Sequence, residues 1–234
     1  MNRKNSIPSI VVIVAAGGTG ARFGGDKLLA PLENGETVFA RCLRNLQGSG
    51  VSFVVPARDL SALRKALPEE LAAVVNWVSG GDTRAHSVGK ALDFLAEQGV
   101  LPDAIAVHDA ARPHATYALL QECWGLLQRD PVACGVIPFH RVTDTIHIAD
   151  PTSDALCQTP PRALLRAAET PQFFRTQALL ESHRRWAALP LAEQGAFTDD
   201  ASLVRAMLPE ARILFYENPR PNPKITFPHD LHLQ

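Results

Sequence analysis

The chain is 234 residues long, with 46% hydrophobic and 20% charged residues, a globular composition that excludes disordered, collagen-like and disulfide-dense proteins. Its length allows one large domain or two small ones. With 23 basic and 24 acidic residues its net charge is −1, so charge gives no reason to expect nucleic acid or a membrane surface as a partner. We therefore expect any anionic ligand to be held by local clusters of positive charge.

The start of the chain and its cysteines bear on the cellular compartment. Arg3 and Lys4 precede the apolar run 10–16, which is far shorter than the roughly 20 residues that span a bilayer. Because this run passes directly into a glycine-rich loop, we predict a buried first strand rather than a cleaved leader. The scattered cysteines favour free cytosolic thiols over extracellular disulfides, and we expect a cytoplasmic protein. These cysteines are Cys42, Cys123, Cys134 and Cys157.

Short apolar runs alternate with helical patterns along the first 137 residues. The apolar runs predict strands over Ile10–Val14, Val51–Val55, Val74–Val78, Ala104–Val107 and Val132–Ile137. Apolar residues at three- and four-residue spacing predict helices over Val38–Leu46, Leu60–Leu67, Ser87–Leu95 and Ala118–Leu127. Continuously apolar strands separated by helices predict an α/β fold, with a doubly wound, mostly parallel sheet covered on both faces.

The pattern changes after Pro138. Thr and His alternate over residues 139–161, turn residues occur at 150–153, and no helical pattern returns until about Thr176. We therefore expect residues 139–170 to form a protruding β-arm. The segments Ile213–Tyr216 and Lys224–Phe227 suggest a return to the sheet. One domain over residues 1–234 with an arm fits this pattern better than two domains.

A glycine-rich loop follows the first predicted strand and runs from Ala15 to Lys27. Its backbone N–H groups can approach phosphate oxygens without interference from Cβ atoms, and Arg22 and Lys27 add positive charge. Leu28 after Lys27 excludes a Walker loop, and Phe23 replaces the third glycine of a dinucleotide fingerprint. The loop predicts a phosphate site at the carboxyl edge of the sheet, with a plain strand–helix turn as the alternative.

The loop resembles that of sugar-nucleotide and related nucleotidyltransferases, and five later segments narrow the resemblance. They are Gly80–Val88 (GGDTRAHSV), Val107–Pro113 (VHDAARP), Thr170–Phe174 (TPQFF), Thr198–Ser202 (TDDAS) and Asn222–Thr226 (NPKIT). In this order they are similar to the 2-C-methyl-D-erythritol 4-phosphate cytidylyltransferases of the non-mevalonate isoprenoid pathway. The resemblance extends from about residue 10 to residue 231.

This resemblance implies a Rossmann-like nucleotidyltransferase fold and transfer of CMP from CTP to methylerythritol phosphate with release of pyrophosphate. It also implies a need for Mg²⁺ and a homodimer whose arms reach the neighbouring subunit. The implied nucleotide contacts are Ala15, Ala16, Gly17, Gly18, Gly20, Gly81, Asp82, Ser87 and Ala110. The implied catalytic cations are Arg22, Lys27, Arg162 and Lys224. The implied contacts of the acceptor substrate are Asp109, Arg112, Thr145, Arg162, Thr170 and Thr198, with Asp109 also a weak metal ligand beside the CTP phosphates.

The residues themselves suit this chemistry. A phosphate monoester has a second pKa near 6 and is largely ionised at neutral pH, so the attack needs no general base. The barrier is the approach of one anion to another, which cations and Mg²⁺ lower by neutralising charge and aligning the reactants.

Plainer roles remain open for several residues. Asp109 could cap a turn, Arg84 could be a solvated cation, and Asp82 could cap the helix that follows it. Asp199 and Asp200 are expected to cap the helix that begins at Ala201 rather than to bind metal. His108 and His114 have a spacing that is poor for zinc, and we expect the three tryptophans to pack in the core.

Two alternative functions also remain open. A ribitol 5-phosphate cytidylyltransferase would share the nucleotide loop and the chemistry but differ in its polyol pocket. A non-catalytic CTP-binding relative is suggested by Asp26, which places a negative charge directly beside Lys27.

Overall fold

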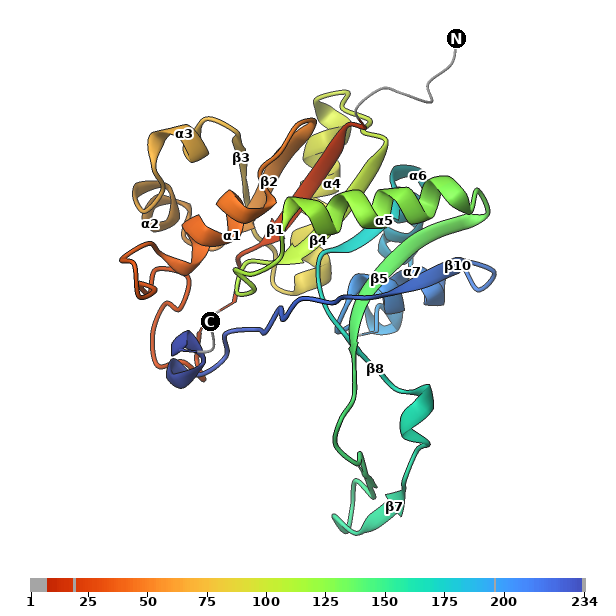
Figure 1. Cartoon of the computed structure of the whole chain (residues 1–234). Coiled ribbons are helices and arrows are strands. Elements are labelled where there is room, and N and C mark those ends of the chain that lie inside the picture. The colour runs from red at the N-terminus through yellow and green to blue at the C-terminus, as the bar shows by residue number, and fades with distance from the viewer. Residues whose placement is uncertain (1–7, 19, 196, 233–234) are drawn as a thin grey trace.

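A computed structural model describes residues 8–18, 20–195 and 197–232. Eight strands form one sheet in the order β10-β5-β9-β4-β1-β2-β3, with β8 paired to β5 (Figure 1). β1, β2, β3 and β4 run parallel, as do β5 and β10, whereas β9 is antiparallel to β4 and β5. The strands are β1 (Ile10–Ala15), β2 (Val51–Ala57), β3 (Val75–Ser79), β4 (Ala104–Asp109), β5 (Ala133–Arg141), β8 (Arg166–Ala168), β9 (Gln172–Arg175) and β10 (Arg212–Glu217). The predicted mostly parallel sheet is confirmed.

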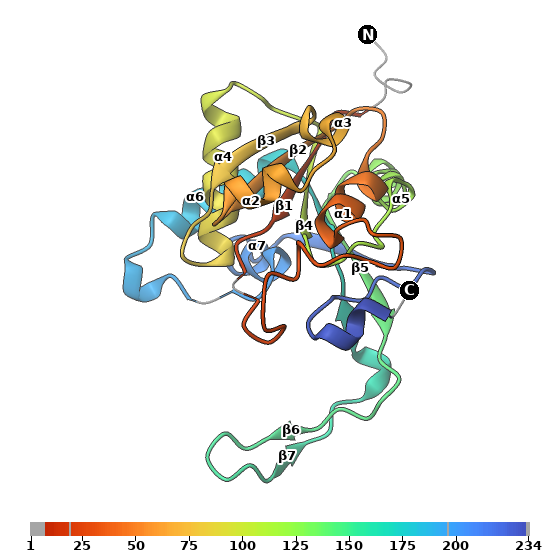
Figure 2. The ribbon, with the colours of Figure 1, turned by 90° about the vertical axis from the view of Figure 1, so that its left-hand side faces the viewer.

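Helices cover both faces of this sheet (Figure 2). Alternate residues of β1 point to opposite faces: Val12 and Val14 belong to the hydrophobic cluster of α1 and α5, whereas Val11 and Ile13 belong to that of α4, α6 and α7. This is the doubly wound arrangement that the sequence predicts. The helices are α1 (Val38–Leu46), α2 (Leu60–Lys65), α3 (Glu69–Ala72), α4 (Arg84–Glu97), α5 (Tyr117–Arg129), α6 (Thr176–Ala187) and α7 (Asp200–Met207).

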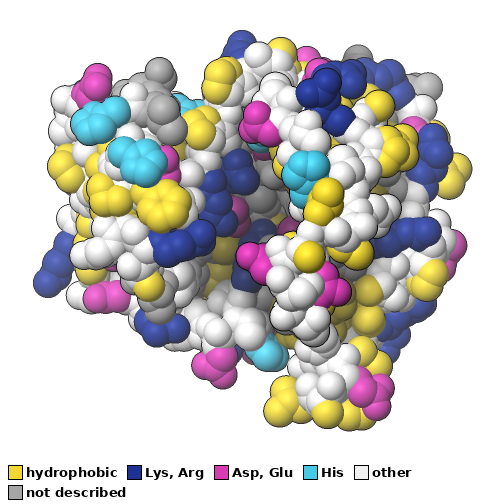
Figure 3. All heavy atoms as spheres, turned by 90° about the horizontal axis from the view of Figure 1, so that it is seen from below, with side chains coloured by type: hydrophobic (Ala, Val, Ile, Leu, Met, Phe, Trp, Pro, Cys, Tyr) yellow, Lys and Arg dark blue, Asp and Glu magenta, His cyan; other side chains and the backbone are white. Residues whose placement is uncertain are grey.

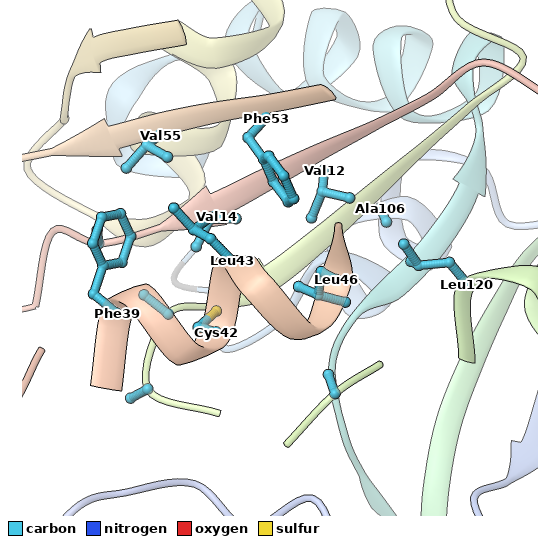
Figure 4. Close-up of a cluster of buried hydrophobic side chains, with 14 of the residues drawn as sticks. Val12, Val14, Phe39, Cys42, Leu43, Leu46, Phe53, Val55, Ala106 and Leu120 are labelled. Carbon is cyan, nitrogen blue, oxygen red and sulfur yellow. The ribbon is translucent and has the colours of Figure 1, made fainter. Parts of the chain in front are cut away.

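Helix α1 shows why the predicted elements form where they do. It begins after Thr37, whose hydroxyl accepts a hydrogen bond from the Ala40 N–H at 3.2 Å, a typical N-cap. Phe39, Leu43 and Leu46 follow at helical spacing and are fully buried against β1 and β2 (Figure 4). Burial of each such side chain stabilises the fold by about 1.5–3 kcal/mol relative to exposure.

The arm leaves the sheet after β5 and returns at β8, whose residues pair antiparallel with 139–141. The excursion expected over 139–170 therefore includes the last residues of β5 and the whole of β8, which belong to the sheet. Its distal part is a two-stranded ribbon of β6 (Ile148–Ala149) and β7 (Leu156–Gln158), which projects from the body (Figure 1). Ile148 and Leu156 on this ribbon are exposed.

The end of the chain differs from the prediction in one segment. β10 forms as expected, but residues 224–227 form no strand. Pro223 and Pro228 flank this segment, and proline cannot donate a ladder hydrogen bond. Ile225 instead lies buried and donates its N–H to the carbonyl of Ala111 at 2.8 Å. This contact places the segment beside the carboxyl end of β4.

The structure also settles two local features of the chain. Among the described residues, no helix is long and apolar enough to cross a bilayer. All four cysteines are free thiols, with Cys42 and Cys123 fully buried.

Candidate active site

A cavity of about 350 Å³ opens at the carboxyl ends of β1, β2 and β4. Figure 3 views this end of the molecule, where Lys and Arg side chains surround a hollow. Eleven of the residues that the sequence predicts for the site line this one cavity. They are Ala15, Ala16, Gly17, Gly18, Lys27, Gly81, Asp82, Ser87, Asp109, Ala110 and Lys224.

The glycine loop forms one wall of the cavity with its first residues and then turns back on itself. Gly20 adopts a φ of +64°, and a Cβ there would lie 2.1 Å from the carbonyl oxygen of Gly25, so this turn requires glycine. The loop thus places Gly20 and Arg22 beyond the cavity lining. Arg22 is exposed, yet its positive charge still contributes to lowering the pKa of Lys27.

The turn before α4 forms a second wall. A Cβ on Gly81 would lie 2.5 Å from the Cβ of His86, so the turn can approach the helix closely only with glycine. The hydroxyl of Ser87 accepts the N–H of Gly81 at 3.0 Å and donates to the carbonyl of Thr83 at 3.0 Å. Thr83 caps α4. The plain interpretation of Asp82 as the cap is therefore wrong.

Two lysines from opposite ends of the chain converge on the cavity. The ammonium of Lys27 donates to the carbonyl of Ile225 at 2.8 Å, and that of Lys224 lies 2.8 Å from Oδ2 of Asp109. Burial, followed by the charges of Lys224 and Arg22, lowers the pKa of Lys27. An anionic ligand would relieve this repulsion, because it places negative charge between the cations.

Asp109 lies at the end of β4 and holds three cations. Arg84 Nε lies 3.3 Å from Oδ1, while Lys224 Nζ and Arg112 Nε lie 2.8 and 3.7 Å from Oδ2. Although burial acts in the opposite direction, these cations hold the pKa of Asp109 well below its ordinary value. The turn-capping role considered for Asp109 and the solvated role considered for Arg84 are both wrong, because their side chains are paired with each other.

Thr170 lies behind Asp109 rather than in the cavity. Its hydroxyl oxygen accepts the N–H of Asp109 at 3.0 Å and lies 3.0 Å from Nδ1 of His108. Nε2 of His108 lies 3.0 Å from the carbonyl of Arg112 and must donate to it, so Nδ1 accepts the Thr170 proton. Burial lowers the pKa of His108 to about 4, which keeps the ring neutral. This chain of hydrogen bonds fixes the end of β4.

The remaining predicted residues lie outside the cavity lining. Thr145 and Arg162 are on the exposed arm, where Arg162 donates to the carbonyl of Thr143 at 2.7 Å. Thr198 is exposed in the segment before α7. Arg112 donates to the carbonyl of Asn222 at 2.7 Å, which ties the end of β4 to the last segment of the chain. None of these four residues lines the cavity.

Sequence reasoning did not assign three charged residues to this site, although it considered plain roles for two of them. Arg58 lines the cavity directly after β2, and a charged residue at a strand's carboxyl end is a signal that could have identified it. Arg84 also lines the cavity. Its Nη1 lies 2.6 Å from Oδ2 of Asp200, which is buried. Asp199 caps α7 as expected, but the prediction for Asp200 is wrong, because its carboxylate pairs with Arg84.

A doubly wound sheet that presents a glycine loop and converging lysines at its carboxyl edge defines a nucleotide-binding α/β protein with a Rossmann-like nucleotidyltransferase fold. Comparison with known proteins narrows this class. The sequence matches the family of 2-C-methyl-D-erythritol 4-phosphate cytidylyltransferases, IspD, over residues 10–234. The chain belongs to this family.

Individual relatives agree with the assignment. The chain is 36% identical over 231 residues to the 2-C-methyl-D-erythritol 4-phosphate cytidylyltransferase of Synechococcus sp., covering 94% of this chain and 92% of that protein. It is 36% identical over 232 residues to a bifunctional IspD/IspF enzyme of Nitrobacter hamburgensis, covering 94% of this chain and 52% of that protein. The solved structure of the Thermus thermophilus enzyme superposes with a TM-score of 0.70 at 26% identity, covering 97% of this chain and 96% of that one. The Francisella tularensis structure, at 24% identity, shares the fold with a TM-score of 0.77 over 96% of this chain and 97% of that one.

Proposed function

We propose that this chain transfers CMP from CTP to 2-C-methyl-D-erythritol 4-phosphate and releases pyrophosphate. The observation that carries the proposal is the convergence of Lys27 and Lys224 on one cavity whose walls are the glycine loop and the Gly81 turn. Backbone N–H groups and cations at such an edge suit a triphosphate. Gly81, Asp82 and Ser87 would then lie beside the base, Ala110 would contact the nucleotide, and Asp109 would lie beside the acceptor substrate and the metal.

The residues of the chain supply positioning and charge. The acceptor phosphate arrives largely ionised, so the cavity must hold two anions together rather than remove a proton. Lys27 would neutralise the nucleotide phosphates. Lys224 would move away from Asp109 and bind the acceptor phosphate. Loss of one such contact costs on the order of 10²–10³ in rate.

Mg²⁺ fits this site as a partner of the nucleotide rather than of a protein cage. Among the described residues, no group of three or more His, Cys, Asp or Glu side chains is arranged to hold a metal. Magnesium is commonly bound by one or two carboxylates together with substrate phosphates, and Asp109 is the buried carboxylate of this cavity. When bound there, Mg²⁺ would neutralise phosphate charge during the transfer.

We also propose a cytoplasmic homodimer in which each arm completes the site of its partner. Thr145 and Arg162 are family positions for the acceptor substrate, yet they lie on a projecting arm with exposed apolar side chains. Exchange of arms would cover this surface and bring both residues to a second cavity. Sedimentation at micromolar concentration should show a dimer, and a fully active monomer would refute the exchange.

A substrate panel tests the proposed reaction. The protein is incubated with CTP and Mg²⁺ together with methylerythritol phosphate, ribitol 5-phosphate or no acceptor, and pyrophosphate release is measured. We expect turnover with methylerythritol phosphate and none without an acceptor. Turnover with ribitol 5-phosphate in its place would assign the alternative polyol. Tight CTP binding without pyrophosphate release from any acceptor would leave a non-catalytic nucleotide-binding protein.

A further inference from the structure

Arg84, the first residue of α4, connects two carboxylates on different elements of the fold. Its Nε donates to Oδ1 of Asp109 at 3.3 Å, and its Nη1 lies 2.6 Å from Oδ2 of Asp200. The carboxylates are 14% and 2% exposed, and the Arg84 side chain is 22% exposed. A guanidinium can join two carboxylates in fixed directions because its donors form a rigid, planar fork.

The carboxylate behind Arg84 is itself fixed to the sheet. Asp200 is the first residue of α7, and Gln172 of β9 holds the N-terminus of this helix. The Gln172 amide donates to Oδ2 of Asp199 at 2.7 Å, and its oxygen accepts the N–H of Ala201 at 2.9 Å. Asp199 in turn accepts the N–H of Ser202 at 3.0 Å. Asp200 is therefore a rigid anchor, and Arg84 transmits its position to Asp109.

The other two cations at Asp109 come from different surroundings. Lys224 comes from the irregular segment after β10, and its side chain is 43% exposed. Arg112 stands farther away, at 3.7 Å. Lys224 is a cation of the proposed reaction, so it has reason to turn toward a phosphate when one enters, whereas Arg112 is held by the carbonyl of Asn222. Asp109 would then keep Arg84 as its partner.

We propose that Arg84 is a positioning residue that, anchored on Asp200, keeps the Asp109 carboxylate in place when Lys224 leaves it for a substrate phosphate. The inference rests on the proposed function, and it assigns Arg84 a role through Asp109 rather than through direct contact with the nucleotide. Thr198 precedes Asp200 by two residues, so the same anchor sets the segment expected to meet the acceptor substrate.

A double-mutant cycle tests this role. Arg84→Met and Asp109→Asn should each lower kcat/KM by about 10²-fold, the loss typical of misplacing a catalytic group. If Arg84 acts through Asp109, the double variant should lose no more than Asp109→Asn alone. Losses that multiply to about 10⁴-fold, or an Arg84→Met enzyme within about threefold of wild type, would overturn the proposal. Arg205→Met, on the exposed side of α7, is the matched control and should retain wild-type activity.

Two further variants separate positioning from folding. Arg84→Lys keeps the charge but offers one ammonium to two carboxylates, and Asp200→Asn removes the anchor. Both should lower kcat by about tenfold in wild type and have no effect in the Asp109→Asn background. If Arg84→Met fails to fold, as judged by circular dichroism and thermal melting, the cycle is read with Arg84→Lys. A wild-type chain without turnover refutes the proposed function alone, and the cycle is then read in CTP affinity by calorimetry.

Discussion

Replacement of Gly81 by alanine should weaken CTP binding while leaving the chain folded. The added Cβ would lie 2.5 Å from the His86 Cβ and 2.9 Å from the His86 carbonyl carbon, whereas carbon atoms in contact prefer about 3.5–4.0 Å. The turn must therefore move by about 1 Å, because the backbone of α4 behind it is held by its own hydrogen bonds. Overpacking of this kind costs about 1–3 kcal/mol. If the turn moves to relieve this strain, the hydrogen bond from Gly81 to Ser87 is lost. CTP binding must then restore the strained geometry, so CTP affinity falls about 5- to 150-fold.

Isothermal titration with CTP measures this change, and thermal melting shows whether the variant is folded. Gly25→Ala is the matched control, because it lies in the neighbouring glycine loop and its added Cβ would meet no atom within 4 Å. We expect the control to bind CTP like wild type. A folded Gly81→Ala protein whose CTP affinity stays within about twofold of wild type would refute the steric reasoning.

Three further predictions follow from the charges and from the arm. Lys27→Met should lower kcat about 10²–10³-fold in the pyrophosphate assay, whereas the control Lys65→Met, on the surface of α2, should keep wild-type activity. Because the pKa of Lys27 is lowered, the affinity of the wild-type protein for CTP should fall, as pH rises, at a lower pH than an ordinary lysine would give. A loss of CTP affinity only near the pKa of an ordinary lysine would contradict this reasoning. Burial lowers the pKa of His183 to about 4, so below about pH 6.5 the unfolded chain binds a proton that the folded chain does not bind. The free energy of unfolding should therefore fall by about 2–3 kcal/mol by pH 4.5. Urea unfolding of His183→Leu should show a smaller fall in acid, and a pH dependence identical to that of wild type would exclude His183 as its source. Mixing equal amounts of the inactive variants Lys27→Met and Arg162→Ala should restore about a quarter of the wild-type rate if arms are exchanged. About half of the dimers are then mixed, and each mixed dimer has one intact site of two. A mixture without activity would exclude the exchange of arms.

Local patterns in the sequence predicted most of the elements correctly. The helix Val38–Leu46 forms with the predicted bounds, because a capping threonine and apolar residues at helical spacing act within a single segment. The strand pattern also predicted which edge of the sheet carries the site, because parallel strands present their carboxyl ends together. Residues 224–227 were assigned wrongly, since their β-like composition is outweighed by the prolines on either side.

The sequence by itself determined the alternation of strands and helices, the glycine loop, and the motifs that indicate a cytidylyltransferase. These depend on residues close together in the chain, where spacing alone sets backbone freedom and amphipathic faces. The tertiary structure decided which side chains meet their partners. Arg84 lies between Asp109 and Asp200, Lys27 donates to the carbonyl of Ile225, and the Thr170 hydroxyl accepts the N–H of Asp109 at the end of β4. Each of these contacts joins segments at least 25 positions apart, and electrostatic pairing at such separations depends on distance and burial in the folded chain, which no local pattern encodes.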